Sequence, residues 1–179
     1  MEVDRSFYHT TCTPTMSSST DRTLSCSYQT HLFDCLPLYS TRLVRETEFT
    51  YPTRFQVTEP SEVATILQDY FRDKDREEFL IVLLDTANTV TGLSQISVGG
   101  LSSSVVEPRQ IFKTAILANA AAIILAHQHP SGNPEPSRED ILITTQLVEA
   151  GEVMGIPVHD HLIIAESDFT SLTERGVIE

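Results

Sequence analysis

The chain has 179 residues, 40% of them apolar, which allows one domain with a buried core plus a tail. Acidic residues outnumber basic ones by 25 to 12, and residues 57–179 carry nineteen of the acidic and seven of the basic side chains. Because this charge repels phosphate backbones, we expect no direct binding to nucleic acid. No apolar run is long enough to span a membrane, and the first 30 residues lack the apolar core of a signal peptide, so we expect a cytoplasmic protein.

The first 36 residues have the composition of a disordered tail. Twelve of the 21 residues from Thr10 to Thr30 are Ser or Thr, without apolar periodicity. All three cysteines precede residue 36, and their number and spacing fit neither a disulfide framework nor a zinc ribbon. We expect residues 37–60 to be a transitional segment with one or two extended pieces packed on the domain, and residues 61–179 to form the domain.

From Ser61 onward the apolar pattern predicts alternating helices and strands. Apolar side chains recur on one helical face between Val63 and Phe71, with Ser61 as the N-cap. Unbroken apolar runs at 79–84 and 121–126 have strand length and predict strands covered on both faces. The remaining elements are expected to be strands at 89–98 and 158–164, helices at 108–119 and 137–155, and a closing helical turn at 169–175. Hairpin and crossover connections both occur in this order, so we expect an α/β fold with a mixed β-sheet layered against helices.

Two histidines follow the apolar run that ends at residue 126. Because side chains alternate along a strand, His127 and His129 point the same way and can share one metal ion. Residues 130–136 contain three prolines and one glycine, and such a stiff loop would bring the next helix back over the histidines. Asp140, in the first turn of that helix, can then supply an oxygen ligand. Two imidazoles and a carboxylate leave one tetrahedral position open for water, as in a catalytic zinc site.

Each of these features also has a simpler interpretation. A lone histidine is usually a core or surface residue, and Ser137 with Asp140 fits a capping box in which Asp140 bonds back to the Ser137 amide. The coincidence of the features favours the metal site. His159 and His161 repeat the histidine spacing, but no stiff loop or helix-start acid follows them. We therefore expect Asp160 or His161 to support the first site by hydrogen bonding.

The spacing of His127, His129, Ser137 and Asp140 matches the JAMM motif of JAB/MPN-type metalloproteases, and the surrounding sequence resembles the RadC branch of bacterial JAB-domain proteins. The resemblance covers about residues 42–175. It implies a JAB/MPN fold, similar to that of cytidine deaminases, and Zn²⁺ bound by His127, His129 and Asp140. Further segments that agree are Glu77-Glu78-Phe79, Leu83-Leu84-Asp85, Pro108-Arg109, Asn119-Ala120-Ala121 and Asp160-His161-Leu162.

The resemblance also implies catalytic roles. In JAMM sites a glutamate from an earlier strand handles the proton of the zinc-bound water, and the matching position here is Glu77. Glu78 is the competitor, because adjacent strand residues face opposite sides and only one can point at the metal. Ser137 would donate a hydrogen bond to the oxyanion, although capping the helix would use the same oxygen. The implied function is a zinc-dependent metallopeptidase or isopeptidase acting on a peptide or an isopeptide-linked protein.

A second hypothesis is a catalytically silent protein-interaction module whose partners bind along the acidic face. RadC-like proteins have traditionally been associated with DNA repair, so one form of this hypothesis is an interaction module that takes part in repair. Their helix-hairpin-helix region has no counterpart in the Ser/Thr-rich tail, and with the acidic domain this argues against direct DNA binding. A zinc nucleobase deaminase is excluded because its H-x-E and P-C-x-x-C ligands are absent. The sequence leaves the substrate and the oligomeric state open.

Overall fold

The computed structural model describes residues 40, 43–44, 55–98 and 106–178. The predicted tail at 1–36 lies outside these residues. In chain order the described elements are α1 (Pro60–Phe71), β1 (Glu78–Leu84), β2 (Val90–Val98), α2 (Pro108–Leu117), β3 (Ala122–Gln128), α3 (Arg138–Met154), β4 (Val158–Ile164) and β5 (Phe169–Ser171).

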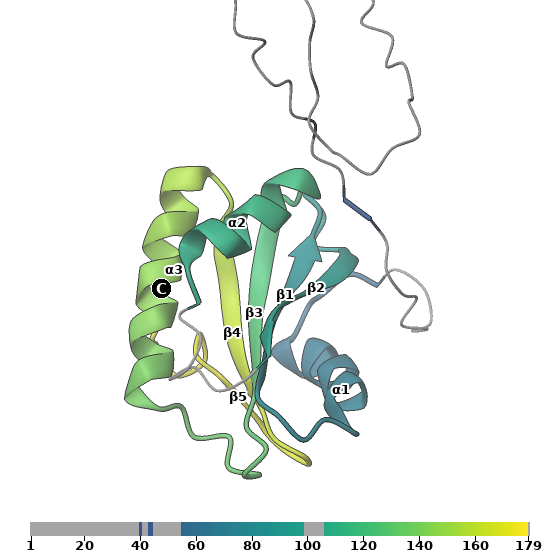
Figure 1. The fold of residues 1–179 in the computed structure, drawn as a ribbon, viewed down its shortest axis with the longest axis vertical. Coiled ribbons are helices and arrows are strands. Elements are labelled where there is room, and N and C mark those ends of the chain that lie inside the picture. The colour runs from purple at the N-terminus through teal and green to yellow at the C-terminus, as the bar shows by residue number, and fades with distance from the viewer. Residues whose placement is uncertain (1–39, 41–42, 45–54, 99–105, 179) are drawn as a thin grey trace, which may run out of the picture. The chain divides into compact units, whose positions relative to one another are not determined.

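The strands form a five-stranded sheet in the order β2-β1-β3-β4-β5 (Figure 1). β3 and β4 are parallel, because α3 crosses between them, and the other neighbouring pairs are antiparallel. The predicted α/β fold with a mixed sheet is confirmed.

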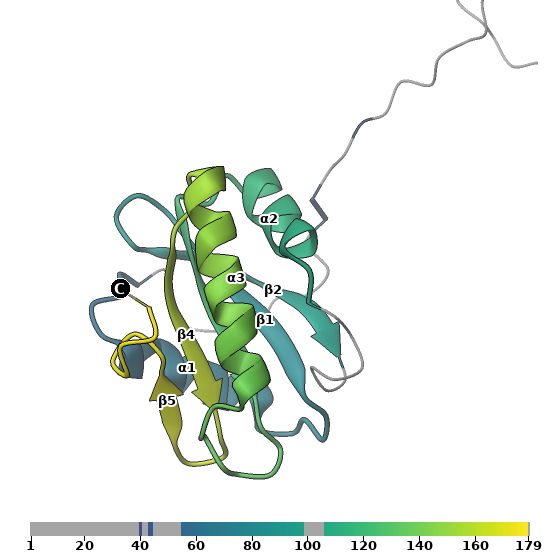
Figure 2. The same cartoon turned by 90° about the vertical axis from the view of Figure 1, so that its left-hand side faces the viewer.

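Helices cover both faces of this sheet. α2 and α3 lie together over one face, and α1 lies behind the other (Figure 2). Alternation along β1 divides its side chains between the two cores: Phe79 and Ile81 pack towards α2 and α3, whereas Leu80 and Val82 pack towards α1. Both β1 and β3 are buried along their whole length, as their unbroken apolar runs predict.

The predicted closing helical turn at 169–175 is wrong. Residues Phe169–Ser171 form β5, which pairs antiparallel with β4, and turns follow it. The strand hydrogen-bonds the edge that β4 would otherwise leave unpaired, and an aromatic and a β-branched residue suit it to a pleated surface. Leu172, directly after it, is fully buried and donates its N–H to the carbonyl oxygen of His161.

The start of α1 also differs from the prediction. Its N-cap is Glu59, with Pro60 in the first helical position, and Ser61 already lies within the helix. The Glu62 carboxylate accepts a hydrogen bond from the Glu59 backbone N–H at 3.2 Å, which supplies a reciprocal cap without a serine hydroxyl.

Only parts of the expected transitional segment are described. Residues 55–57 run extended beside the turn between β1 and β2: Gln56 bridges to Thr89, and the Val57 N–H donates to the Asn88 carbonyl at 2.9 Å. Leu43 and Val44, by contrast, are 51% and 77% exposed. Among the residues described, no helix has the length and apolarity needed to cross a membrane.

Candidate metal centre

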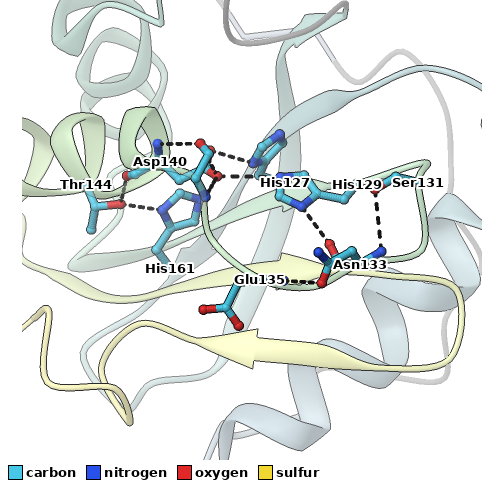
Figure 3. Close-up of polar contacts among 9 residues, drawn as sticks. His127, His129, Ser131, Asn133, Glu135, Asp140, Thr144 and His161 are labelled. Carbon is cyan, nitrogen blue, oxygen red and sulfur yellow. Dashed lines mark hydrogen bonds and ion pairs between the residues drawn. The ribbon is translucent and has the colours of Figure 1, made fainter.

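The end of β3 and the start of α3 bring three ionisable side chains together. His127 lies in β3, His129 follows the strand directly, and Asp140 lies in the first turn of α3. Nδ1 of His127 is 3.1 Å from Oδ1 of Asp140, and Nε2 of His129 is 3.5 Å from Oδ2 of the same carboxylate (Figure 3). One candidate ligand atom from each residue lies within 4.8 Å of the other two. These three residues, the metal group below, could hold a metal ion.

The loop between β3 and α3 sets the tautomer of His129. Nδ1 of His129 lies 2.8 Å from the backbone carbonyl oxygen of Asn133, which can only accept a hydrogen bond, so Nδ1 carries a proton. A neutral His129 ring then presents the lone pair of Nε2 to Asp140. Carbonyl partners of this kind orient metal-ligating histidines in other proteins. A cation between the lone pair and the carboxylate would satisfy both.

Asp140 serves the helix and the metal group at the same time. It is fully buried, and its Oδ2 accepts hydrogen bonds from the N–H and the hydroxyl of Ser137, each at 2.7 Å. The Asp140 N–H donates in turn to Oγ of Ser137 at 3.1 Å, which completes the capping box. Burial works to raise the pKa of Asp140, but the contacts with His127, His129 and Ser137 prevail and hold it well below its usual range. The carboxylate is therefore ionised.

Buried polar atoms that make no hydrogen bond of good geometry gather around this group, among them Nδ1 of His127 and Oδ1 of Asp140, although these two lie 3.1 Å apart. Six such side-chain atoms occur among the described residues, and four belong here: both ring nitrogens of His127, Oδ1 of Asp140 and Nε2 of His161. The large majority of buried polar atoms in proteins are paired. Three of these four atoms belong to residues of the metal group, so a bound cation fits the chemistry of the donors.

Comparison with known proteins shows the family of this chain. Residues 57–177 match the family model of the RadC-like JAB domain. The chain belongs to this family. UPF0758 proteins are similar to it: one from Salinibacter ruber is 63% identical over 126 residues, covering 70% of this chain and 54% of the relative. Another, from Desulforamulus reducens, is 52% identical over 126 residues, covering 70% and 56%. The chain spans about half the length of the curated relatives it matches.

In this RadC-like JAB domain, Glu78 is the first residue of β1 and Glu77 directly precedes it, and the two side chains have different surroundings. Glu78 is buried, and its carboxylate contacts Nζ of Lys74 at 3.3 Å, the hydroxyl of Tyr70 at 3.3 Å and Nε2 of Gln95 at 2.6 Å. Lys74 and Tyr70 come from α1 and the segment after it, on the face opposite α3. Glu78 is thus held by three partners and is turned away from the metal group.

Glu77 directly precedes β1, and the alternation of the strand, continued by one residue, would place it on the same side as Phe79. The Phe79 ring stacks on His127, with 6.2 Å between centroids, and packs in the core beneath α3. Contact with Asp140 is the main reason that the pKa of His129 is raised, and the negative charge of Glu77 adds to the effect. Of the two glutamates, Glu77 is the one whose charge reaches the metal group.

Asp160 and His161 take different positions in the domain. Asp160 accepts hydrogen bonds from the hydroxyl of Ser171 at 2.7 Å and from the N–H of Thr173 at 3.1 Å, so it anchors the turn after β5 and lies outside the metal group. His161 is fully buried beside His127, with 6.4 Å between ring centroids. Burial, with the charge of His127 as a second cause, lowers the pKa of His161 to about 3. Of the two expected supporting residues, His161 is the one at the site.

His159 does not form a second centre with His161. Its Nε2 lies 3.2 Å from Oδ1 of Asn88, and the metal group is the sole metal-ligand cluster found in the part of the chain that the structure describes. Sequence reasoning missed Thr144, whose hydroxyl lies 2.5 Å from Nδ1 of His161. Its position four residues after Asp140, on the same helical face, was the available signal.

Proposed function

We propose that this RadC-like JAB domain is a zinc-dependent metallopeptidase or isopeptidase that hydrolyses an amide bond with an activated water. The convergence of His127, His129 and Asp140, in a group with unpaired buried donor atoms, carries this proposal. Two imidazole nitrogens and one carboxylate oxygen are ligands that zinc prefers, and three protein ligands are the usual number at a catalytic zinc site.

When bound, zinc would lower the pKa of a coordinated water to about 7 and polarise the amide carbonyl. The carboxylate of Glu77 accepts the proton of the attacking water and later passes it to the nitrogen of the leaving amine. The burial of Phe79 beneath His127 excludes water from the inner side of the group.

Ser137 is proposed to donate a hydrogen bond to the oxyanion of the substrate. Its hydroxyl now donates to Oδ2 of Asp140, and this bond must break for the hydroxyl to turn outwards. The backbone N–H of Ser137 bonds the same oxygen at 2.7 Å, so the carboxylate of Asp140 keeps one of the two hydrogen bonds that it accepts from Ser137.

The substrate class that fits this chemistry is a peptide or an isopeptide-linked protein, met in the cytoplasm. Direct contact with nucleic acid is not part of the proposal, because the acidic charge of residues 57–179 opposes it.

The test combines elemental analysis with digestion of a peptide library and of isopeptide-linked substrates. The protein should bind about one zinc ion and cleave a subset of these substrates. Glu77→Gln should retain zinc and lose about 10²- to 10⁴-fold in rate. Glu78→Gln is the matched control, since it makes the same chemical change on the opposite face of β1, and it should keep activity.

Two results would contradict the proposal. Activity that survives Glu77→Gln but fails with Glu78→Gln would show that the base is assigned wrongly. Zinc-loaded protein that cleaves no substrate would favour the protein-interaction module.

A further inference from the structure

The hydroxyl of Thr144 has two polar neighbours and one proton. Oγ1 lies 2.5 Å from the backbone carbonyl oxygen of Asp140 and 2.5 Å from Nδ1 of His161. A carbonyl oxygen can only accept, so the hydroxyl proton of Thr144 goes to Asp140, as is usual for a threonine within a helix. Nδ1 of His161 must then donate to Oγ1 of Thr144.

This direction leaves the other nitrogen of His161 as an acceptor. The ring is fully buried, and burial disfavours a charged imidazolium, so the single ring proton resides on Nδ1 and Nε2 keeps its lone pair. Nε2 is buried and has no hydrogen-bond partner. A buried acceptor of this kind is costly unless a donor reaches it.

The ring of His161 lies between Thr144 and the metal group. Figure 3 shows Thr144 on one side of the ring, with Asp140 and His127 on the other. The ring packs 5.5 Å from Phe79 and 6.4 Å from His127, measured between centroids. Because Nδ1 is turned towards Thr144, Nε2 is on the side of the ring that faces the metal group.

We propose that His161 is a positioning residue of the metal centre: Thr144 fixes the ring proton on Nδ1, and Nε2 accepts a hydrogen bond from a water molecule held there. His161 does not join the metal group itself, whose ligand atoms lie within 4.8 Å of one another. The role of that water rests on the proposed function, whereas the position of the ring proton does not.

The first experiment reads the ring proton directly. Long-range ¹H–¹⁵N correlation spectra of the metal-free full chain should show a protonated Nδ1 and a bare Nε2 for His161. Thr144→Ser keeps the hydroxyl and should keep this pattern, whereas Thr144→Val keeps the shape of the side chain without the hydroxyl and should move protons to Nε2. A wild-type ring protonated on Nε2 would overturn the inference, and that spectrum decides even if a variant fails to fold.

The second experiment measures Zn²⁺ affinity by competition with a chromophoric chelator. Supporting residues of this type change metal affinity about 10- to 100-fold, so His161→Phe, which keeps a ring but no acceptor, should bind Zn²⁺ that much more weakly. His161→Gln, whose side-chain oxygen can accept, should recover part of the loss. Equal affinity of His161→Phe and the wild type would overturn the role of His161.

Failure of the proposed function and failure of the role of His161 give different experimental results. A wild-type chain that binds no Zn²⁺ would overturn the proposed function and the role of His161 within it, while the metal-free spectrum would still report the ring proton. A chain that binds zinc and cleaves amides, but carries its His161 proton on Nε2, would overturn only the further inference.

Discussion

Gly151 is a buried residue in the last turn of α3, and we predict that Gly151→Ala destabilises the domain. A Cβ at this position would lie 2.7 Å from the carbonyl oxygen of Ile156 and 3.4 Å from Cζ of Phe112. Residue Ile156 is held beside Gly151, because its N–H donates to the Gly151 carbonyl at 3.0 Å in the turn that ends α3. The new methyl group therefore cannot be accommodated by a side-chain rotation.

Two opposing effects set the size of the change. Replacing glycine by alanine within a helix gains about 1 kcal/mol. Overpacking a rigid site costs about 1–3 kcal/mol, and contact with backbone is at the upper end of that range. We therefore expect a net loss of about 1–2 kcal/mol in the free energy of unfolding, measured as a lower urea midpoint with an unchanged m-value.

Gly92→Ala is the matched control. Its Cβ would meet only Cδ1 of Leu83, at 3.8 Å, which is an ordinary van der Waals contact, and its φ is not in the left-handed region. This variant should be as stable as the wild type or slightly more stable, since it loses less backbone entropy on folding. If Gly151→Ala matched or exceeded Gly92→Ala in stability, the steric argument would be refuted.

Two further predictions concern the metal and one buried carboxylate. Zn²⁺ at 100 times its dissociation constant should stabilise the wild type by about 2.7 kcal/mol, and Asp140→Asn should abolish this gain; a thermal scan in which both chains respond equally to zinc would count against the metal group. Burial raises the pKa of Tyr70, and the charge and hydrogen bond of Glu78 raise it further. The folded state thus holds the phenolic proton more tightly, so this stabilisation is present below the unfolded pKa of about 10 and is lost as pH rises through the folded value. Glu78→Gln should lower the folded pKa, read by ultraviolet difference titration against Tyr70→Phe, and an unmoved pKa would disprove the contact.

Local patterns were sufficient to predict much of the fold. The apolar runs of β1 and β3 have strand length, and they predict burial on both faces without knowledge of neighbours. The prediction of a helical turn at 169–175 was wrong because a three-residue strand is too short to show a periodic pattern. Its pairing with β4 is decided by tertiary contact.

The metal group could be predicted because its residues are brought together by short-range geometry, whereas its surroundings depend on contacts between distant segments. His127 and His129 are two apart on one strand, and Asp140 follows after a single stiff loop, so short-range geometry brings them together. The choice between Glu77 and Glu78 depends on partners in α1 and β2, and the ring proton of His161 depends on a threonine seventeen residues away. No local pattern in the sequence encodes such contacts.

Asp140 takes part both in the capping box of α3 and in the metal group, and this limits how the centre can be redesigned. One oxygen accepts two hydrogen bonds from Ser137 at the start of α3, and the other has no hydrogen-bond partner and could bind a cation, so a substitution of Asp140 changes both. A histidine at this position would supply a nitrogen ligand but remove the oxygen that accepts the Ser137 N–H, leaving Oγ of Ser137 as the remaining side-chain cap of the helix. Fraying of that first turn would displace Thr144 one turn later, and with it the ring of His161. A new metal preference is therefore more safely sought by changing a histidine than by changing the acid.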